Sequence, residues 1–299
     1  MKGVQDMFGM EYNELTSLLI LGLLIALSIA GIVINAVLLR MLGRMSEKST
    51  SFSIIRNMSI SDLLLCSVTL LICIFRLVLG FPGAYRSSLY CPVLGSMSLF
   101  FSSMSGILMS LLAMERYSVI CHQQGLPHRA IWGVFSAIAL MFAILLIGSS
   151  MLGVFSPEPG FIFCMPNGSR WSINTRMAFN VLLNIPILVL MFCYVSIFIR
   201  CYRSPLTKSD DSLTRKAAIR SLVFLAIFVI CYIPKSTTFV IGAYSGQGAS
   251  PPILYLLIPI AITMLAIINP ALVLLLHRHI KGVVDEIAYC DKSHLFPTE

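Results

Sequence analysis

Seven long apolar runs follow one another along the chain, and the short polar stretches between them hold most of the charged residues. Each run is long enough for a helix to cross a hydrocarbon core of about 30 Å, which takes roughly 20 residues. None alternates polar and apolar positions as the roughly ten-residue strands of a membrane β-barrel would. The runs are Ser17–Met41, Ser53–Leu79, Cys91–Ile120, Ala130–Val154, Thr175–Ile199, Ala217–Ala243 and Ile253–Leu276. The pattern predicts an all-α membrane protein with a seven-transmembrane helix bundle over residues 17–276.

Composition agrees with a membrane protein. Of the 299 residues, 58% are apolar and 11% are charged, where soluble domains have about 25% charged residues. These values exclude an ordinary soluble enzyme and a disordered chain, and nine cysteines are too few for a disulfide-rich secreted scaffold. The net charge of +8 comes from short basic clusters between the apolar runs rather than from a basic stripe. We therefore expect a lipid membrane as the surroundings and no nucleic acid as a partner.

The basic residues also predict the orientation. With the N-terminus outside, fifteen Lys and Arg residues fall on the cytoplasmic side and six on the outer side. Residues 1–16 are then an extracellular tail, and residues 277–299 lie in the cytoplasm. The segment His277–Ile287 is basic and amphipathic, so we expect a short eighth helix that lies flat on the inner leaflet.

Ionisable residues inside apolar runs are functional candidates, because a charge in lipid is costly. Asp62 lies in the second run, Glu115 and Arg116 close the third, and Lys235 follows Pro234 in the sixth. Each has a plainer interpretation: Arg116 can be an end residue that snorkels to the interface, and a proline can simply kink its helix. Nothing in the chain forms a nucleophile–base set or a zinc motif, so we expect no enzyme activity.

One polar or proline landmark occurs in each run, and together they have a known order. They are Asn35, Asp62, Glu115-Arg116-Tyr117, Trp132, Pro186 with Tyr194, Phe228 to Pro234, and Asn269-Pro270. In this set and order the chain resembles the rhodopsin-like (class A) G protein-coupled receptor family over essentially its whole length. The resemblance implies a multi-pass receptor of the plasma membrane that binds a small extracellular ligand and activates a heterotrimeric G protein.

The same resemblance implies roles for particular residues. A disulfide would join Cys91, at the outer end of the third helix, to Cys164 in an outer loop. Arg116 would pair with Glu115 at rest and meet the G protein and Tyr194 when active. The residues implied for activation and coupling are Glu115, Arg116, Tyr117, Tyr194, Phe228, Tyr232, Pro234, Asn269 and Pro270.

Three positions depart from the family pattern. Thr214 replaces the acidic partner of Arg116 at the base of the sixth helix, Tyr232 replaces a tryptophan, and Val273 replaces a tyrosine. The first change predicts a weaker resting state with basal activity. The other two leave open a receptor-like protein that does not signal, while a transporter or channel lacks a polar pathway.

The ligand pocket implied by the family lies between the outer halves of the helices. Ser98 stands where amine receptors have an aspartate, and Thr263 stands where opsins have the retinal-linked lysine, so neither ligand is expected. Lys235 either pairs with an anionic ligand or snorkels to the outer surface. Ser102 and Tyr232 would add hydrogen bonds.

Asp62 and Ser105 resemble two ligands of the family's sodium site, with Asn269 nearby. Two supporting polar positions are Leu265 and Ala266 here, so a protonated or water-solvated Asp62 stands beside an allosteric sodium ion as an alternative. No other cofactor is indicated.

Two sites of modification are also predicted. Asn167 begins an Asn-Gly-Ser glycosylation sequence in an outer loop, and Cys290 follows the amphipathic segment. Cys290 is either palmitoylated or a free thiol.

Overall fold

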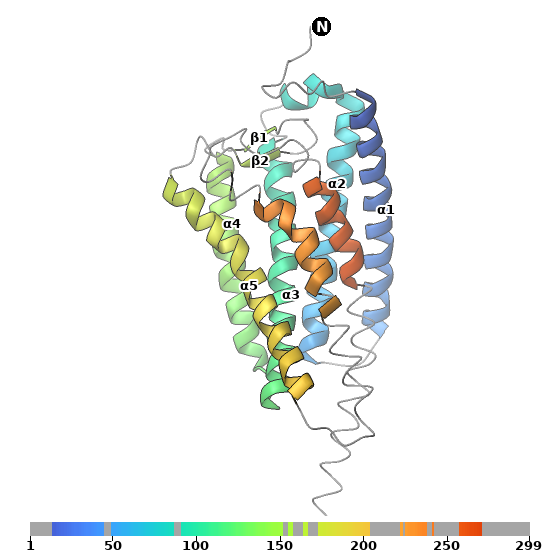
Figure 1. Ribbon diagram of the computed structural model, residues 1–299. Helices are drawn as coiled ribbons and strands as arrows, with labels where there is room; N and C mark the ends of the chain where they lie inside the picture. The colour runs from blue at the N-terminus through green and yellow to red at the C-terminus, as the bar shows by residue number, and fades with distance from the viewer. Residues whose placement is uncertain are drawn as a thin grey trace, which may run out of the picture.

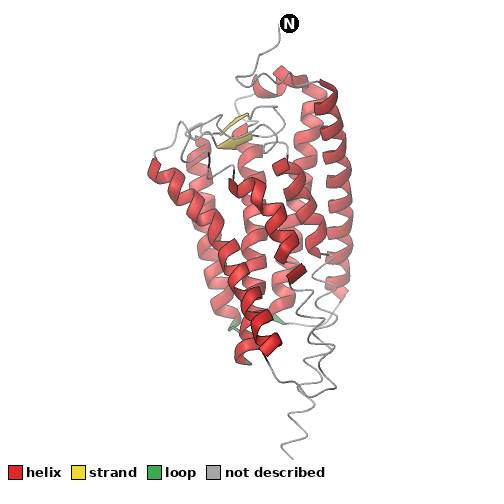
Figure 2. Ribbon diagram, in the orientation of Figure 1, coloured by secondary structure: helices red, strands yellow, loops and turns green. Residues whose placement is uncertain are grey.

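The computed structural model describes residues 14–44, 49–86, 91–151, 155–157, 164–166, 173–203, 222–223, 225–237, 241 and 257–270. Its helices are α1 (Glu14–Arg44), α2 (Thr50–Arg86), α3 (Ser96–His122), α4 (His128–Met151) and α5 (Ile173–Arg203). A π-helical turn, Cys91–Gly95, leads into α3, and two further helical segments are Leu225–Thr237 and Leu257–Pro270. Strands β1 (Phe155–Pro157) and β2 (Cys164–Pro166) join α4 to α5 (Figures 1 and 2).

Each of the seven predicted apolar runs contains a described helix, which confirms the helical bundle. The boundaries differ at some ends: α1 begins at Glu14 rather than Ser17, and α2 continues to Arg86 rather than Leu79. Hydropathy marks where lipid ends, whereas helical hydrogen bonds continue into the interfacial region beyond it. The predicted extracellular tail and amphipathic eighth helix lie outside the described residues, apart from the first turn of α1.

Helix α3 runs through the middle of the bundle, with α1 and α2 on one side and α4 and α5 on the other (Figure 1). Of its most apolar stretch 78% is buried, against 17% for the corresponding stretch of α4. The outer helices instead expose large apolar side chains such as Leu140 and Ile147 of α4 and Leu188 of α5. Such a surface suits lipid and not water.

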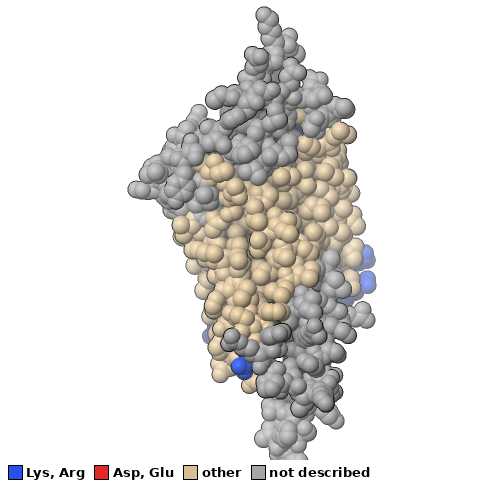
Figure 3. Space-filling view, viewed as in Figure 1, with Lys and Arg blue, Asp and Glu red and all other residues tan. Residues whose placement is uncertain are grey.

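The described surface seen in Figure 3 is almost wholly uncharged across its middle, and the clearly visible Lys and Arg atoms lie toward the lower part. A broad uncharged belt is what a hydrocarbon environment requires, since an exposed charge there is costly. Four of the described helices are long and apolar enough to cross a membrane, and shorter apolar helical stretches of the same bundle are Asn184–Arg200 within α5, Leu225–Thr237 and Leu257–Pro270. The chain is therefore a multi-pass membrane protein.

Two polar contacts fix the helices against each other at mid-depth. The Ser110 hydroxyl of α3 donates to the Pro186 carbonyl of α5 at 2.7 Å. The Asn35 amide of α1 donates to the Ala266 carbonyl in Leu257–Pro270 at 3.0 Å. In lipid such inter-helix hydrogen bonds replace the hydrophobic effect as specific contacts between helices.

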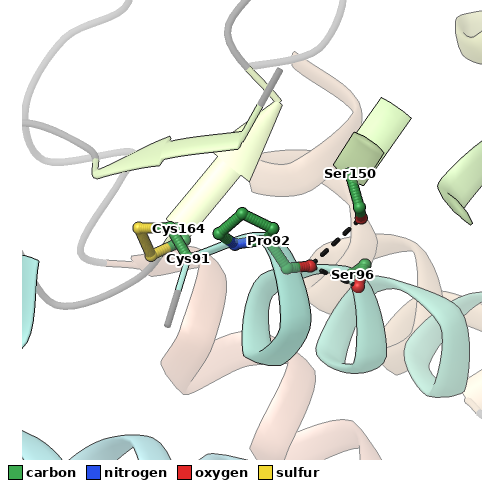
Figure 4. Close-up of a disulfide and its surroundings, with 5 residues drawn as sticks. All are labelled: Cys91, Pro92, Ser96, Ser150 and Cys164. Carbon is green, nitrogen blue, oxygen red and sulfur yellow. Dashed lines mark hydrogen bonds between the residues drawn. A yellow bond between two sulfur atoms is a disulfide. The ribbon is translucent and has the colours of Figure 1, made fainter. Parts of the chain in front are cut away.

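The predicted disulfide is confirmed. Cys91 and Cys164 are bonded, with their Cα atoms 5.2 Å apart, so β2 is fastened to the turn that begins α3 (Figure 4). Strand β1 pairs antiparallel with β2, placing Pro157 opposite Cys164. The Ser150 hydroxyl of α4 donates to the Pro92 carbonyl at 3.2 Å, which ties a third element to the same corner. The hairpin is thereby held over the N-terminal end of α3, the end that the predicted orientation places outside.

Gly95 makes that close approach possible. A Cβ atom there would lie 2.9 Å from the Cys164 carbonyl oxygen and 3.0 Å from Phe155 Cδ1. Both distances are shorter than carbon atoms tolerate without a shift of the neighbour. The hairpin therefore packs on bare backbone, directly beside the outer pocket described below.

Candidate functional site

The predicted switch residues lie at the C-terminal end of α3. The Arg116 guanidinium Nε is 3.5 Å from Glu115 Oε2, and the two side chains are 13% and 12% exposed. The Tyr117 ring packs against Phe192 of α5, with ring centroids 5.6 Å apart. Tyr194, the expected active-state neighbour of Arg116, is buried on the same helix. The C-terminal halves of α3 and α5 are therefore packed together next to an ion pair of adjacent residues.

A buried polar cluster joins three helices lower in the bundle than the disulfide. The Asn269 amide donates to Asp62 Oδ2 of α2 and to the Ser105 hydroxyl of α3, both at 3.3 Å. Asp62 and Asn269 are each 1% exposed. Among the described atoms, Asp62 Oδ1 and Asn269 Oδ1 accept no hydrogen bond. Unsatisfied buried oxygens are rare, and they mark a place where a donor or a cation is expected.

Lys235 lies inside the bundle, which contradicts the alternative that it snorkels to the outer surface. Its side chain is 1% exposed, and Nζ donates to the Ser102 hydroxyl at 3.0 Å. The ammonium also stands 5.3 Å from the centre of the Tyr232 ring, within the range of a cation–π contact. Among the described residues no carboxylate forms an ion pair with it.

An outer pocket of about 30 Å³ opens beneath the β hairpin. It brings together four residues predicted for the ligand site: Ser98, Ser102, Lys235 and Thr263. The rest of its wall is Thr69, Gly95, Leu99, Cys164, Ile258, Pro259 and Ile262. Because the walls come from α2, α3, β2 and the two later segments, binding here would bear on several helices at once.

A second, smaller cavity of about 10 Å³ lies next to the first and contains the Asp62 cluster. Its wall is Asp62, Leu65, Ser102, Ser105, Cys231, Tyr232, Lys235, Ile262, Leu265, Ala266 and Asn269. Tyr232, expected in the ligand pocket, is in this wall and not in that of the outer pocket. Ser102, Ile262 and Lys235 belong to both walls.

Sequence reasoning did not foresee that these two sites adjoin. The spacing of Ser98, Ser102 and Ser105 held the signal, because positions i, i+4 and i+7 share one face of a helix. Thr69 and Gly95 were not predicted for the pocket, and no motif marks them.

The remaining switch residues are also placed. Phe228 and Tyr232 are buried and stacked, with ring centroids 5.5 Å apart. Pro234 is half-buried two residues after Tyr232, and Asn269-Pro270 ends the last described helical segment. Asn167, Thr214, Val273 and Cys290 lie outside the described residues, so glycosylation, palmitoylation and the effects of the two substitutions stay predictions.

Comparison with known proteins decides the family. The family model described as 7 transmembrane receptor (rhodopsin family) matches residues 32–272. The chain belongs to the rhodopsin family of seven-transmembrane receptors. As a rhodopsin-family receptor it is a signalling protein and not an enzyme.

Individual relatives of this rhodopsin-family chain are distant. Rhodopsin of Lethenteron camtschaticum is 25% identical over 250 residues, which are 74% of this chain and 69% of that protein. Human galanin receptor type 1 is 24% identical over 246 residues, covering 76% and 68% of the two chains. The crystal structure of squid rhodopsin matches with a TM-score of 0.69 at 18% identity, over 88% of this chain and 78% of that one. The structural match therefore supports the fold, and the identities are too low to carry over a ligand.

Proposed function

We propose that this receptor sits in the plasma membrane with its N-terminus outside, binds a small anionic ligand in the outer pocket and activates a heterotrimeric G protein. The observation that carries the proposal is the buried Lys235 ammonium, which lines the pocket and has a hydroxyl for its hydrogen-bond partner. A lysine buried at this depth is tolerated when a function requires its charge.

The chemistry of the pocket favours a carboxylate or a phosphate group. Lys235 offers two further N–H donors beyond the one directed at Ser102. Charge-assisted hydrogen bonds to an anion are about twice as strong as neutral ones. Ser98 and Thr263 add hydroxyls to the wall, and the other wall residues are mostly apolar. The narrow volume favours a small acid or the acidic head of a longer molecule.

The inner end supports coupling to a G protein. The Arg116 guanidinium Nε lies 3.5 Å from Glu115 Oε2, and Glu115 Oε2 accepts no hydrogen bond among the described residues. Separation of this pair would let the guanidinium turn toward a G protein. In this proposal the receptor has a resting state with the Glu115–Arg116 pair formed and an active state with the pair separated. The ligand binds the active state more tightly and so favours it.

Nucleotide exchange on a panel of G proteins tests the proposal. Membranes would carry the natural chain, Arg116→Ala, or Arg129→Ala as a control that removes an exposed basic residue near the same end. We expect exchange with the natural chain and the control, and none with Arg116→Ala at equal surface expression. A library of small acids would be added next, and agonism should be lost in Lys235→Met.

Exchange that is equal in all three membranes would refute G protein activation by this chain. It would favour the receptor-like protein that does not signal, for which the substitutions at Tyr232 and Val273 are the sequence evidence. Agonists that act equally on Lys235→Met would instead refute the anionic ligand while leaving coupling intact.

A further inference from the structure

One ammonium group serves two cavities. The outer pocket and the Asp62 cavity share Lys235 and Ser102, and Lys235 Nζ is hydrogen-bonded to the Ser102 hydroxyl at 3.0 Å. The group at the boundary is therefore a buried lysine side chain, held by one hydrogen bond to a hydroxyl and by a contact with the Tyr232 ring. Small rotations about the lysine stem would turn its donors toward one cavity or the other.

The lower cavity contains a buried carboxyl group with one oxygen that accepts no hydrogen bond among the described atoms. The Asn269 amide donates to Asp62 Oδ2, while Oδ1 accepts no hydrogen bond among the described atoms. The Asn269 Oδ1 atom is likewise unsatisfied. A hydrogen-bond donor or a positive charge next to these two oxygens would lower the free-energy cost of burying them. That cost is highest for an ionised carboxylate that nothing compensates.

A sodium ion fits this cavity poorly. Hard cations need several oxygen ligands, commonly six or so. Leu265 and Ala266 of the wall supply none. Lys235 in the same wall would repel a second cation. The residues present therefore do not suit the ion that the family resemblance implies.

We propose that Lys235 is the resident cation of this receptor: its ammonium supplies the counter-charge of Asp62, through one bridging water in the lower cavity, where a sodium ion would otherwise stand. A cavity of this size holds about one water, and a water with polar groups on several sides is well placed to bridge. The same ammonium then faces the ligand pocket.

Competition for Lys235 links the two cavities. An anion in the outer pocket draws the ammonium outward and leaves Asp62 without its counter-charge. The loss of the counter-charge then changes the strength of the Asp62–Asn269 hydrogen bond, which joins α2 to the last helical segment. This part of the inference rests on the proposed function, whereas the pairing of Lys235 with Asp62 does not.

A double-mutant cycle on thermal stability tests the pairing without ligand or G protein. The purified chain in lipid nanodiscs would be compared with Lys235→Met, Asp62→Asn and the double variant. Lys235→Met should lower the unfolding midpoint in the natural background by roughly 5–10 °C, because it leaves a buried carboxylate uncompensated. In the Asp62→Asn background the same change should have no effect or raise the midpoint.

Thr263→Val is the matched control, since Thr263 lines the outer pocket alone. Its effect should be equal in both backgrounds. An equal effect of Lys235→Met in both backgrounds would overturn the proposal. If a single variant fails to fold, recovery of folded receptor by the double variant is the expected result, and continued failure overturns the proposal.

Sodium provides an independent arm. The natural chain should melt at the same temperature in sodium chloride and in choline chloride of equal ionic strength. A sodium-specific rise in the midpoint would mean that the ion and not Lys235 occupies the cavity. The double-mutant cycle could show coupling between Lys235 and Asp62 while no acid promotes nucleotide exchange. That combination would refute the anionic ligand and would support Lys235 as the counter-charge of Asp62.

Discussion

Replacement of Gly95 by alanine tests how tightly the outer hairpin is packed. Gly95 is in the right-handed helical conformation, with φ −64° and ψ −45°, so alanine meets no backbone strain there. Alanine should even gain about 0.5–1 kcal/mol over glycine from its lower conformational entropy in the unfolded chain. The question is whether packing outweighs this gain.

The contacts around Gly95 indicate that the steric cost of the added Cβ exceeds the entropic gain. The new Cβ would meet the Cys164 carbonyl oxygen at 2.9 Å, Cys164 Cβ at 3.0 Å and Phe155 Cδ1 at 3.0 Å. Cys164 is fixed by its disulfide to Cys91, so it has little freedom to withdraw. Overpacking of this kind costs about 1–3 kcal/mol. After the entropic gain is subtracted, the net effect is a destabilisation of up to about 2.5 kcal/mol.

Gly22 of α1 is the matched control, because no atom lies within 4 Å of a Cβ built there. Gly22→Ala should keep the full gain of about 0.5–1 kcal/mol. The two variants should thus differ by about 2 kcal/mol, or roughly 4–8 °C in unfolding midpoint. Thermal melts of the purified receptors in nanodiscs measure the difference. Equal midpoints for Gly95→Ala and Gly22→Ala would refute the packing described for the hairpin.

Three further substitutions probe contacts that hold the bundle. Ser110→Ala removes the hydroxyl that donates to the carbonyl of the α5 proline, and should lower stability by about 1 kcal/mol in melts; Ser103→Ala, which removes only a bond within α3, is its control and should change less. Asn35→Ala separates α1 from the last helical segment and leaves a buried carbonyl with fewer donors, so the midpoint should fall by several degrees, roughly 2–4 °C per kcal/mol. Replacement of Cys91 by serine opens a loop of 73 residues and should destabilise the chain by about 4 kcal/mol, with loss of surface expression.

Each of these three has a result that would contradict it. A Ser103→Ala variant as damaged as Ser110→Ala would mean that the contact between α3 and α5 adds nothing. An unchanged unfolding midpoint for Asn35→Ala would mean that apolar packing, and not this hydrogen bond, holds α1 in the bundle. Full surface expression of Cys91→Ser would show that the hairpin holds its position without the covalent bond.

The helices could be predicted because hydropathy over some twenty residues reports directly on contact with lipid. The disulfide followed from family resemblance, and the structure bears it out. The position of Lys235 could not be settled in advance, because periodicity places a residue on a face and says nothing of how deep its flexible stem reaches. Its hydrogen bond to Ser102 depends on the distance between two helices, which only the fold provides.

The spacing of the serines in the sequence predicts a hydroxyl-bearing face of α3. Which cavity each serine lines depends on the neighbouring helices, which the sequence does not place. Ser98, Ser102 and Ser105 share that face, and the structure assigns the first to the outer pocket, the last to the Asp62 cavity and the middle one to both. Gly95 shows the opposite case, since a single glycine carries no signal until a loop lies against it.

Because α3 is central, the protein should tolerate few insertions or deletions within this helix. One rigid helix carries the outer disulfide turn, the hydroxyls of both cavities and the Glu115–Arg116 pair. Because an α-helix turns by about 100° per residue, insertion or deletion of one residue between Ser98 and Arg116 would rotate one set of groups away from the other. Nearly every position of that stretch is buried and only Met114 is exposed, so the helix has little lipid-facing surface on which such a shift could be absorbed. Length changes should therefore be excluded from this segment, while the loops and the lipid-facing α4 accept them.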